Sequence, residues 1–160
     1  WDCLPFDRLS PQGRLVGQRI ETLARFCAGE APSILLTTIN AIVQKLPPAD
    51  YLIDNSLVVS PASAHSPASL AEFLSNHSYL RTDTVRETGE FAIRGGIVDV
   101  FPPGCSDPVR LDFFGDEIET MRVFDAASQR SAGRLDRLVL RPVAEFMLTE
   151  ASISRFRTGY

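Results

Sequence analysis

The N-terminal part of the chain has a hydrophobic pattern that predicts a helix. After Ser10-Pro11, apolar residues recur at every third or fourth position, as on one face of a helix, and Gly29 is a typical C-terminal stop. The apolar positions of this helix are Val16, Ile20, Leu23, Ala24 and Cys27. The residues before it, Trp1–Ser10, have no regular pattern and predict an extended loop.

A strand and a second helix are predicted next. The run Ile34-Leu35-Leu36 is continuously apolar, which is typical of a parallel strand buried on both faces. Thr38 or Asn40 can then cap a short helix through Val43, before Pro47-Pro48. A helix, a buried strand and a helix in this order predict part of a doubly wound α/β domain.

Beyond Pro48 the pattern is that of an α+β domain with mainly antiparallel strands. The segment 57–59 is a short apolar strand, and Ser66-Pro67 begins a helix, with serine as the cap and proline in the first turn. Further strands are predicted over 91–94, 97–101, 109–114, 117–124 and 135–140. Gly115-Asp116 predicts a tight turn between two of them, and helical periodicity returns from Glu145.

The strand over 109–114 carries side chains that packing alone does not explain. Alternation places Val109, Leu111 and Phe113 on a core face, so that Arg110, Asp112 and Phe114 share the opposite face. An aromatic ring beside an arginine on an outward face is typical of protein interfaces. The alternative is structural, with the Phe114 ring tucked under a loop and Arg110 paired with Asp112 or Glu117.

The following strand, over 117–124, predicts an irregularity. Met121 and Val123 are out of phase with Ile118, so these three apolar residues cannot share one face of a regular strand. A bulge near Glu119-Thr120 restores the phase.

Composition and charge narrow the class of protein. The chain has 160 residues, of which 44% are hydrophobic, and no apolar run approaches the ~20 residues of a membrane span. The net charge of −4 argues against nucleic-acid binding by bulk electrostatics. Cys3, Cys27 and Cys105 are widely spaced, which favours a reducing, cytoplasmic compartment. Because the chain starts at Trp1 and not at a methionine, we expect a piece of a longer protein.

The sequence offers no good nucleotide site. A phosphate-binding loop needs glycines followed by Lys-Ser or Lys-Thr, but the only lysine, Lys45, has no such neighbours. Asp116-Glu117 could follow an apolar strand as magnesium ligands, but a hairpin turn explains them more simply. We therefore predict no cofactor in this chain.

Metal ligands and nucleophiles are equally scarce in the sequence. His65 and His77 are the only histidines, and neither belongs to a cluster with ligand spacing. His77 ends the apolar face of its helix, and Cys27 lies on an apolar helix face, so both are predicted to be structural. No catalytic residue and no metal site are predicted.

Four sequence elements resemble the transcription-repair coupling factor family (Mfd). They are Trp1–Asp7 with Ser10-Pro11, Ile34–Ala41 with Gln44–Pro48, Gly89–Pro102, and Arg110–Glu119 followed by Phe124-Asp125 and Ser128–Ser131. The third and fourth elements also occur in UvrB, the excision-repair helicase, whereas the first element and the Ser-Gln-Arg-Ser run favour the coupling factor. The resemblance covers nearly the whole chain.

The resemblance implies a UvrB-like N-terminal region with three parts. Residues 1–48 would be the C-terminal part of a degenerate, helicase-like α/β domain 1a without a phosphate loop. Residues 49–144 would be an inserted UvrB-type domain that binds UvrA, and residues 145–160 the start of domain 1b. Carried over by motif, the UvrA contacts of the family fall on Arg94, Arg110 and Phe114.

For the complete protein the resemblance implies an ATP-dependent DNA translocase, which uses ATP and magnesium to displace stalled RNA polymerase from double-stranded DNA. The motor and polymerase-binding domains would lie outside this chain, and a C-terminal domain would mask the UvrA-binding surface. Two alternatives remain. Binding to damaged or single-stranded DNA, as in UvrB, calls for a basic groove with stacking aromatics, and ATP hydrolysis by this chain calls for the missing phosphate loop.

Overall fold

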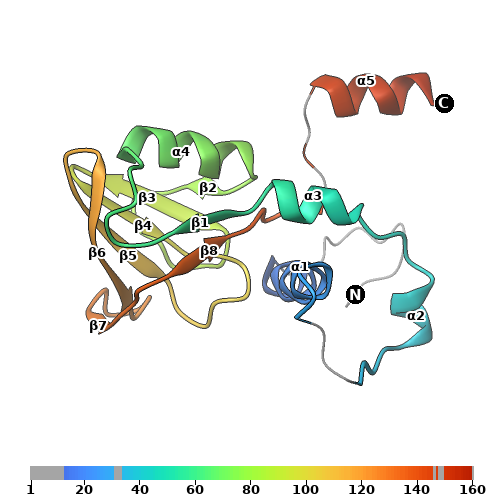
Figure 1. Cartoon of the computed structure of the whole chain (residues 1–160), viewed down its shortest axis with the longest axis horizontal. Helices are drawn as coiled ribbons and strands as arrows, with labels where there is room; N and C mark the ends of the chain where they lie inside the picture. Colours follow the sequence, from blue (N-terminus) through green and yellow to red (C-terminus); the bar gives the residue numbers. More distant parts are fainter. Residues whose placement is uncertain (1–12, 31–33, 146, 148–149, 160) are drawn as a thin grey trace.

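The computed structural model describes residues 13–30, 34–145, 147 and 150–159 (Figure 1). The predicted loop at Trp1–Ser10, with the first of the four family-like elements, lies outside these residues. The described elements, in chain order, are α1 (Gly13–Cys27), α2 (Ile39–Ile42), α3 (Ala49–Asp54), β1 (Leu57–Val59), α4 (Pro67–Asn76), β2 (Leu80–Arg81), β3 (Glu90–Arg94), β4 (Ile97–Val100), β5 (Val109–Phe114), β6 (Glu117–Phe124), β7 (Ser131–Arg134), β8 (Leu138–Leu140) and α5 (Glu150–Thr158).

The strands form one six-stranded sheet and one two-stranded ribbon. The sheet has the order β2-β3-β4-β5-β6-β7, with every neighbouring pair antiparallel except β2–β3. Two tight hairpins build its centre, and each contains a glycine with positive φ, Gly95 at 59° and Gly115 at 61°. The predicted α+β, mainly antiparallel architecture is confirmed.

Two short strands and one short helix were not predicted. The edge strands β2 and β7 are two and four residues long and carry little hydrophobic pattern. The strand expected over 135–140 is shorter, since β8 covers only Leu138–Leu140 and pairs with β1 and not with the sheet. The helix α3 begins directly after Pro47-Pro48, where only the end of a helix was expected.

One face of the six-stranded sheet, which we call the inner face, packs against α4 and the β1–β8 ribbon. In Figure 1, α4 lies along one side of the sheet. The Ser66 side chain caps this helix by accepting a hydrogen bond from the Ser69 N–H (3.1 Å). The buried core of this layer comprises Val59, Leu70, Leu74, Tyr79, Phe91, Val98, Val100, Val109, Leu111, Ile118, Met121, Leu138 and Leu140. Each such side chain contributes about 1.5–3 kcal/mol through burial of apolar surface.

The predicted irregularity in β6 is confirmed. Asp112 pairs with Thr120, but the next residue, Phe113, pairs with Ile118, so that Glu119 has no counterpart on β5. This extra residue lets Ile118 and Met121 both face the core, where they are 1% and 0% exposed.

The N-terminal segment differs from the prediction in one element. The apolar face of α1 is confirmed, because Ile20 and Ala24 pack against Leu52 of α3. The buried strand expected at Ile34–Leu36 is wrong: these residues have no regular structure, and their side chains are 76%, 54% and 91% exposed. A strand buried on both faces needs strands beside it and helices over it, and the described residues supply neither here.

The two ends of the segment between β1 and β8 lie side by side. These two strands pair antiparallel, with Leu57 opposite Leu140, and the ribbon runs from the sheet towards α3 and α1 (Figure 1). Ion pairs Arg141–Glu21 and Arg19–Glu145 join α1 to the residues after β8. In the described part of the chain, no helix is long and apolar enough to cross a membrane.

Candidate functional site

The other face of the six-stranded sheet, which we call the outer face, carries polar and charged rows. Because directly paired residues point to the same side of a sheet, the strand register defines these rows. One row crosses five strands and contains Ala92, Asp99, Arg110, Arg122 and Arg134. The next row, closer to the hairpin turns, contains Arg94, Ile97, Asp112 and Thr120.

The carboxylate of Asp99 is the centre of this face. It is 1% exposed and accepts hydrogen bonds from two arginines. Arg110 binds it in a bidentate manner, with Nε donating to Oδ1 at 2.7 Å and Nη2 donating to Oδ2 at 2.9 Å. Arg94 Nη2 donates to Oδ2 at 2.8 Å. One buried negative charge therefore holds two guanidinium groups in fixed positions, and the cluster keeps a net positive charge.

The two arginines of this cluster differ in exposure. The side chain of Arg94 is 53% exposed, whereas that of Arg110 is 20% exposed and lies over the ring of Phe124, with 4.8 Å between its Cζ and the ring centroid. The hydrogen bond to Asp99 raises the pKa of Arg110 above its ordinary value, more than burial lowers it. Arg110 is thus a permanently charged, largely packed residue, and Arg94 presents more surface to a partner.

These contacts correct the expectation for Arg110. Its carboxylate partner is Asp99, and not Asp112 or Glu117 as the structural alternative supposed. Asp99 occupies two of the N–H donors of Arg110. A guanidinium has five N–H donors, so Arg110 retains donors beyond these two.

Phe114 is the exposed aromatic that the sequence predicted. Its side chain is 81% exposed at the end of β5, next to the turn at Gly115, and its strand partner is Glu117. The alternative that a loop covers the ring is therefore wrong. A ring this exposed contributes little to folding and presents a large apolar surface to the solvent.

The register brings the two hairpin turns next to each other. The Phe113 N–H donates to the Gly96 carbonyl at 2.8 Å, so the turn at Gly95-Gly96 lies beside the end of β5. A Cβ atom on Gly96 would stand 3.1 Å from the Phe113 carbonyl oxygen, which explains a glycine at this position. Arg94 and Phe114, far apart in sequence, thus belong to one surface. We call this surface, made by Arg94, Asp99, Arg110 and Phe114, the docking face.

Sequence reasoning missed Asp99. The signal was present, because Asp99 is the one charged residue in the otherwise apolar strand β4, where it follows Val98 and precedes Val100. A carboxylate in such a strand needs a cationic partner. Only the register of β3, β4 and β5 shows that Arg94 and Arg110 supply it.

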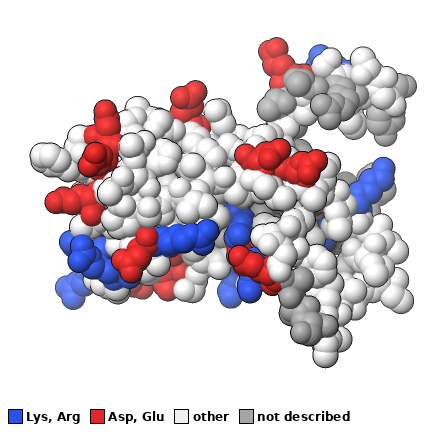
Figure 2. Space-filling model, viewed as in Figure 1, with Lys and Arg blue, Asp and Glu red and all other residues white. Residues whose placement is uncertain are grey.

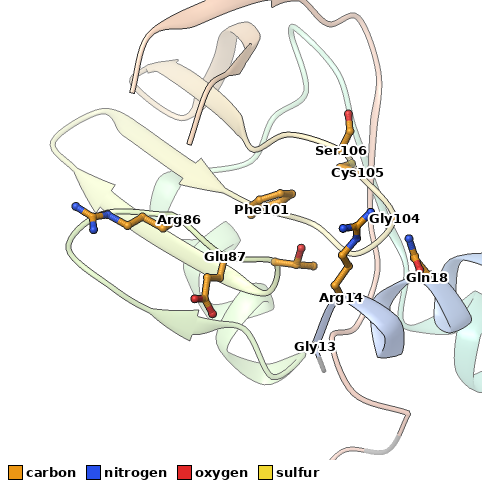
Figure 3. A pocket seen from close by; sticks show the side chains of 10 residues that line it. Gly13, Arg14, Gln18, Arg86, Glu87, Phe101, Gly104, Cys105 and Ser106 are labelled. Carbon is orange, nitrogen blue, oxygen red and sulfur yellow. The ribbon is translucent and has the colours of Figure 1, made fainter. Parts of the chain in front are cut away.

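A cleft of about 740 Å³ lies between α1 and the loops around β3 and β4. Arg14 reaches it from α1, and Arg86, Glu87 and Cys105 come from the loops (Figure 3). Burial, with a smaller contribution from Asp107, raises the pKa of the Cys105 thiol, which makes it a poor nucleophile. No group of three or more metal-ligating side chains occurs among the described residues.

His77 has a structural role, as predicted. It follows α4 and is 9% exposed, with Nδ1 at 2.6 Å from the Phe73 carbonyl oxygen and Nε2 at 3.1 Å from Asn55 Oδ1. Its ring also stacks on Phe73 with a centroid distance of 3.9 Å. Both ring nitrogens are engaged within the protein, so the residue fixes the end of α4.

The surface charge is unevenly distributed. In Figure 2, Lys and Arg side chains gather over the lower left of the molecule, where Figure 1 places β6, β7 and β8. Acidic side chains dominate the upper side of the same view. Some acidic side chains lie among the basic ones (Figure 2), so basic residues are locally concentrated on a chain whose net charge is −4.

Comparison with known proteins gives a consistent result. A family model described as the UvrB interaction domain matches residues 57–146. The transcription-repair-coupling factor of Escherichia coli K12 is 35% identical over 160 residues, which is 100% of this chain and 14% of that protein. Similar coupling factors from Haemophilus influenzae and Mycobacterium tuberculosis are 32% and 35% identical, over 100% and 94% of this chain and 14% and 13% of their own length.

These similarities confirm the resemblance that the four sequence elements indicated. The match to the family model contains α4 and all strands of both sheets, and therefore the whole docking face. The chain spans about one seventh of the length of the curated relatives that it matches.

Proposed function

This chain belongs to the UvrB interaction domain family, and from that premise we propose that it is a non-catalytic module that docks UvrA through the docking face. The observation that carries the proposal is Phe114, an aromatic side chain that is 81% exposed beside a positively charged cluster. Large exposed aromatics next to arginines are the residue types that dominate interface energetics.

Each residue of the docking face has a distinct part in the proposal. Phe114 inserts into an apolar depression of UvrA and supplies the buried anchor. Arg94, which is half exposed, donates charge-assisted hydrogen bonds to an acidic group of the partner. Arg110 is held by Asp99 and adds positive charge behind the ring, with little movement on binding. Because the arginines are already ordered, binding costs less side-chain entropy.

The module would serve a longer protein that couples transcription to repair, as the names of the similar proteins suggest. In this proposal residues 1–48 complete a degenerate helicase-like domain 1a, and residues 145–160 begin domain 1b. The exposed apolar side chains of Ile34, Leu36 and Ile39 support that assignment, because they are suited to pack against further chain. Residues 49–144 are then the inserted domain.

Further expectations concern parts of the longer protein. The ATP-driven DNA translocase, with its ATP, magnesium and double-stranded DNA, the contact with RNA polymerase and the masking C-terminal domain all belong to this proposal. The docking role of the present chain does not depend on them.

The test is a binding titration of UvrA with the chain and with the variant Phe114→Ala. We expect the substitution to cost about 2 kcal/mol of binding free energy, as truncation of an interface anchor does. The matched control is Leu80→Ala, which removes another exposed apolar side chain, 64% exposed, on the far edge strand β2. Equal affinities of the Phe114 variant and the unmodified chain would contradict the proposal.

The alternative of single-stranded DNA binding is tested with the same proteins. We expect no measurable shift with a single-stranded oligonucleotide, because the chain carries a net charge of −4. Binding that weakens with salt and is lost in Phe114→Ala would favour the alternative, since both stacking and phosphate contacts would then act through this face.

A further inference from the structure

Two exposed arginines on the outer face form no ion pair with the carboxylates that the structure describes. Arg122 on β6 and Arg134 on β7 are exposed and are direct strand partners of each other. Arg122 is also the direct partner of Arg110 on β5. Three guanidinium groups therefore stand in one row across three neighbouring strands.

This row is unfavourable for folding. Like charges directly opposite each other on neighbouring strands destabilise a sheet. Arg110 is compensated by Asp99, but in the described part of the chain neither Arg122 nor Arg134 forms an ion pair with a carboxylate. Side chains that cost stability and fill no core are expected where an external charge compensates them.

The row is continuous with the docking face. Arg110 belongs to both, so positive charge extends from Arg94 through Arg110 to the sheet edge at Arg134. The chain as a whole is acidic, so this run of positive charge is local. The arrangement fits a partner surface with several carboxylates in a line.

A protein partner fits this row better than a nucleic acid. The chain as a whole carries a net charge of −4, and the carboxylate of Asp112 lies on the same face beside the arginines, which disfavours a phosphate backbone. The row also leads to an exposed apolar ring, Phe114, which suits a protein surface with an apolar depression.

We propose that Arg122 and Arg134 extend the docking face across β6 and β7 and steer an acidic protein surface onto it. This inference rests on the proposed function, since the steered partner is the one that the docking face binds. Exposed charges at the rim of an interface act mainly on the association rate, whereas buried anchors act on the dissociation rate. The two arginines therefore have a kinetic signature that differs from that of Phe114.

The test measures association and dissociation rates with UvrA for the double variant Arg122→Gln/Arg134→Gln at several salt concentrations. We expect association to slow by roughly threefold or more at low salt, with a weaker salt dependence and a nearly unchanged dissociation rate. Thermal unfolding of the same variant should occur at an equal or slightly higher temperature, because the repulsion in the row is relieved.

Two control variants isolate the effect of charge at this place. The pair Arg122→Lys/Arg134→Lys keeps both charges and should associate as fast as the unmodified chain. The pair Arg25→Gln/Arg157→Gln removes two exposed arginines from α1 and α5, away from the sheet, and should leave the association rate unchanged.

The outcomes separate this inference from the proposed function. Unchanged association of the glutamine pair, while Phe114→Ala still weakens binding, overturns the steering row and leaves the docking function intact. Slow association of the lysine pair also overturns steering by charge. Failure of the unmodified chain to bind UvrA overturns both. Binding of duplex DNA that is lost in the glutamine pair, with UvrA association unaffected, assigns the row to nucleic acid and overturns the proposal.

Discussion

The inner and outer faces of the six-stranded sheet are built from alternate residues of the same strands, but they differ in burial and in the kind of side chain that they carry. On β5, Val109 and Leu111 of the inner face are 2% and 0% exposed and belong to the core. Arg110, between them, binds Asp99 on the outer face, and Phe114 extends into solvent. The inner face stabilises the domain through apolar burial, and the outer face displays charges and an exposed ring, to which the proposed function assigns the binding of UvrA.

The outer face itself has a covered part and an exposed part. Near Phe124 a second apolar cluster, with Val85, Ala92 and Phe101, covers this face and supports the Arg110 guanidinium. Near the hairpin turns none of the described residues covers it, and Gly95, Phe114 and Gly115 are exposed. The exposed ring of Phe114 thus belongs to the same face as a well-packed cluster, so the docking face would need little rearrangement to bind the proposed partner.

The largest expected difference in stability is between two single alanine variants, one on each face of the sheet. Phe91→Ala, on the inner face at 0% exposure, should lower the free energy of unfolding by about 3–5 kcal/mol, because it leaves a cavity in the core. Phe114→Ala should change it by less than about 0.5 kcal/mol. Chemical denaturation of the two variants checks this, and similar losses for both would remove the distinction between the faces.

A smaller loss is expected for Asp99→Ala. This substitution removes the acceptor of three hydrogen bonds and leaves Arg110 packed without its counter-charge, so we expect a loss of about 2 kcal/mol in the free energy of unfolding. The double variant Asp99→Ala/Arg110→Ala should lose less than the sum of the two single variants, because the uncompensated charge is then absent. A denaturant series on the three variants measures this coupling, and strict additivity would show that the ion pair is not a unit.

A smaller effect is expected for Arg94, whose substitution should weaken UvrA binding more than it lowers the stability of the chain. Arg94→Ala removes a half-exposed partner of Asp99, and we expect it to cost about 1 kcal/mol of UvrA binding with at most about 0.5 kcal/mol of stability. Calorimetric titration together with denaturation measures both quantities for one protein. A stability loss larger than the binding loss would place Arg94 among the structural residues.

The smallest effect is expected at Thr120, whose hydroxyl donates to Asp112 Oδ2 at 2.8 Å on the outer face. Thr120→Val keeps the shape of the side chain and removes one partly exposed hydrogen bond, so we expect a loss below about 1 kcal/mol and no change in UvrA affinity. A large loss of affinity would extend the docking face to this part of β6.

Much of the sheet could be predicted from the sequence because its signals are local. Alternation along β5, the turn at Gly115 and the phase shift that required a bulge in β6 all depend on neighbouring residues, and all three are present in the structure. The helices α1 and α4 were likewise visible in their apolar faces, and in the case of α4 in its cap. Residue types and spacing were sufficient for these elements.

What the sequence did not reveal depends on distant pairing. The partner of Arg110 is Asp99 on the neighbouring strand, and only the register shows it. The apolar run at Ile34–Leu36 has the composition of a buried strand, but no strand pairs with it among the described residues, and its side chains are exposed. Composition alone could not identify the partner of Arg110 or show that the run Ile34–Leu36 is exposed, because both depend on which distant residues lie opposite in the fold.

The most direct test of the docking face is amide hydrogen exchange of the chain with and without UvrA. We predict slower exchange on binding at the two hairpin turns, around residues 94–97 and 113–117, and no change in α4, whose core-facing residues Leu70 and Leu74 are already buried. Unchanged exchange at both turns, with new protection confined to α1 or to residues 34–46, would contradict this prediction.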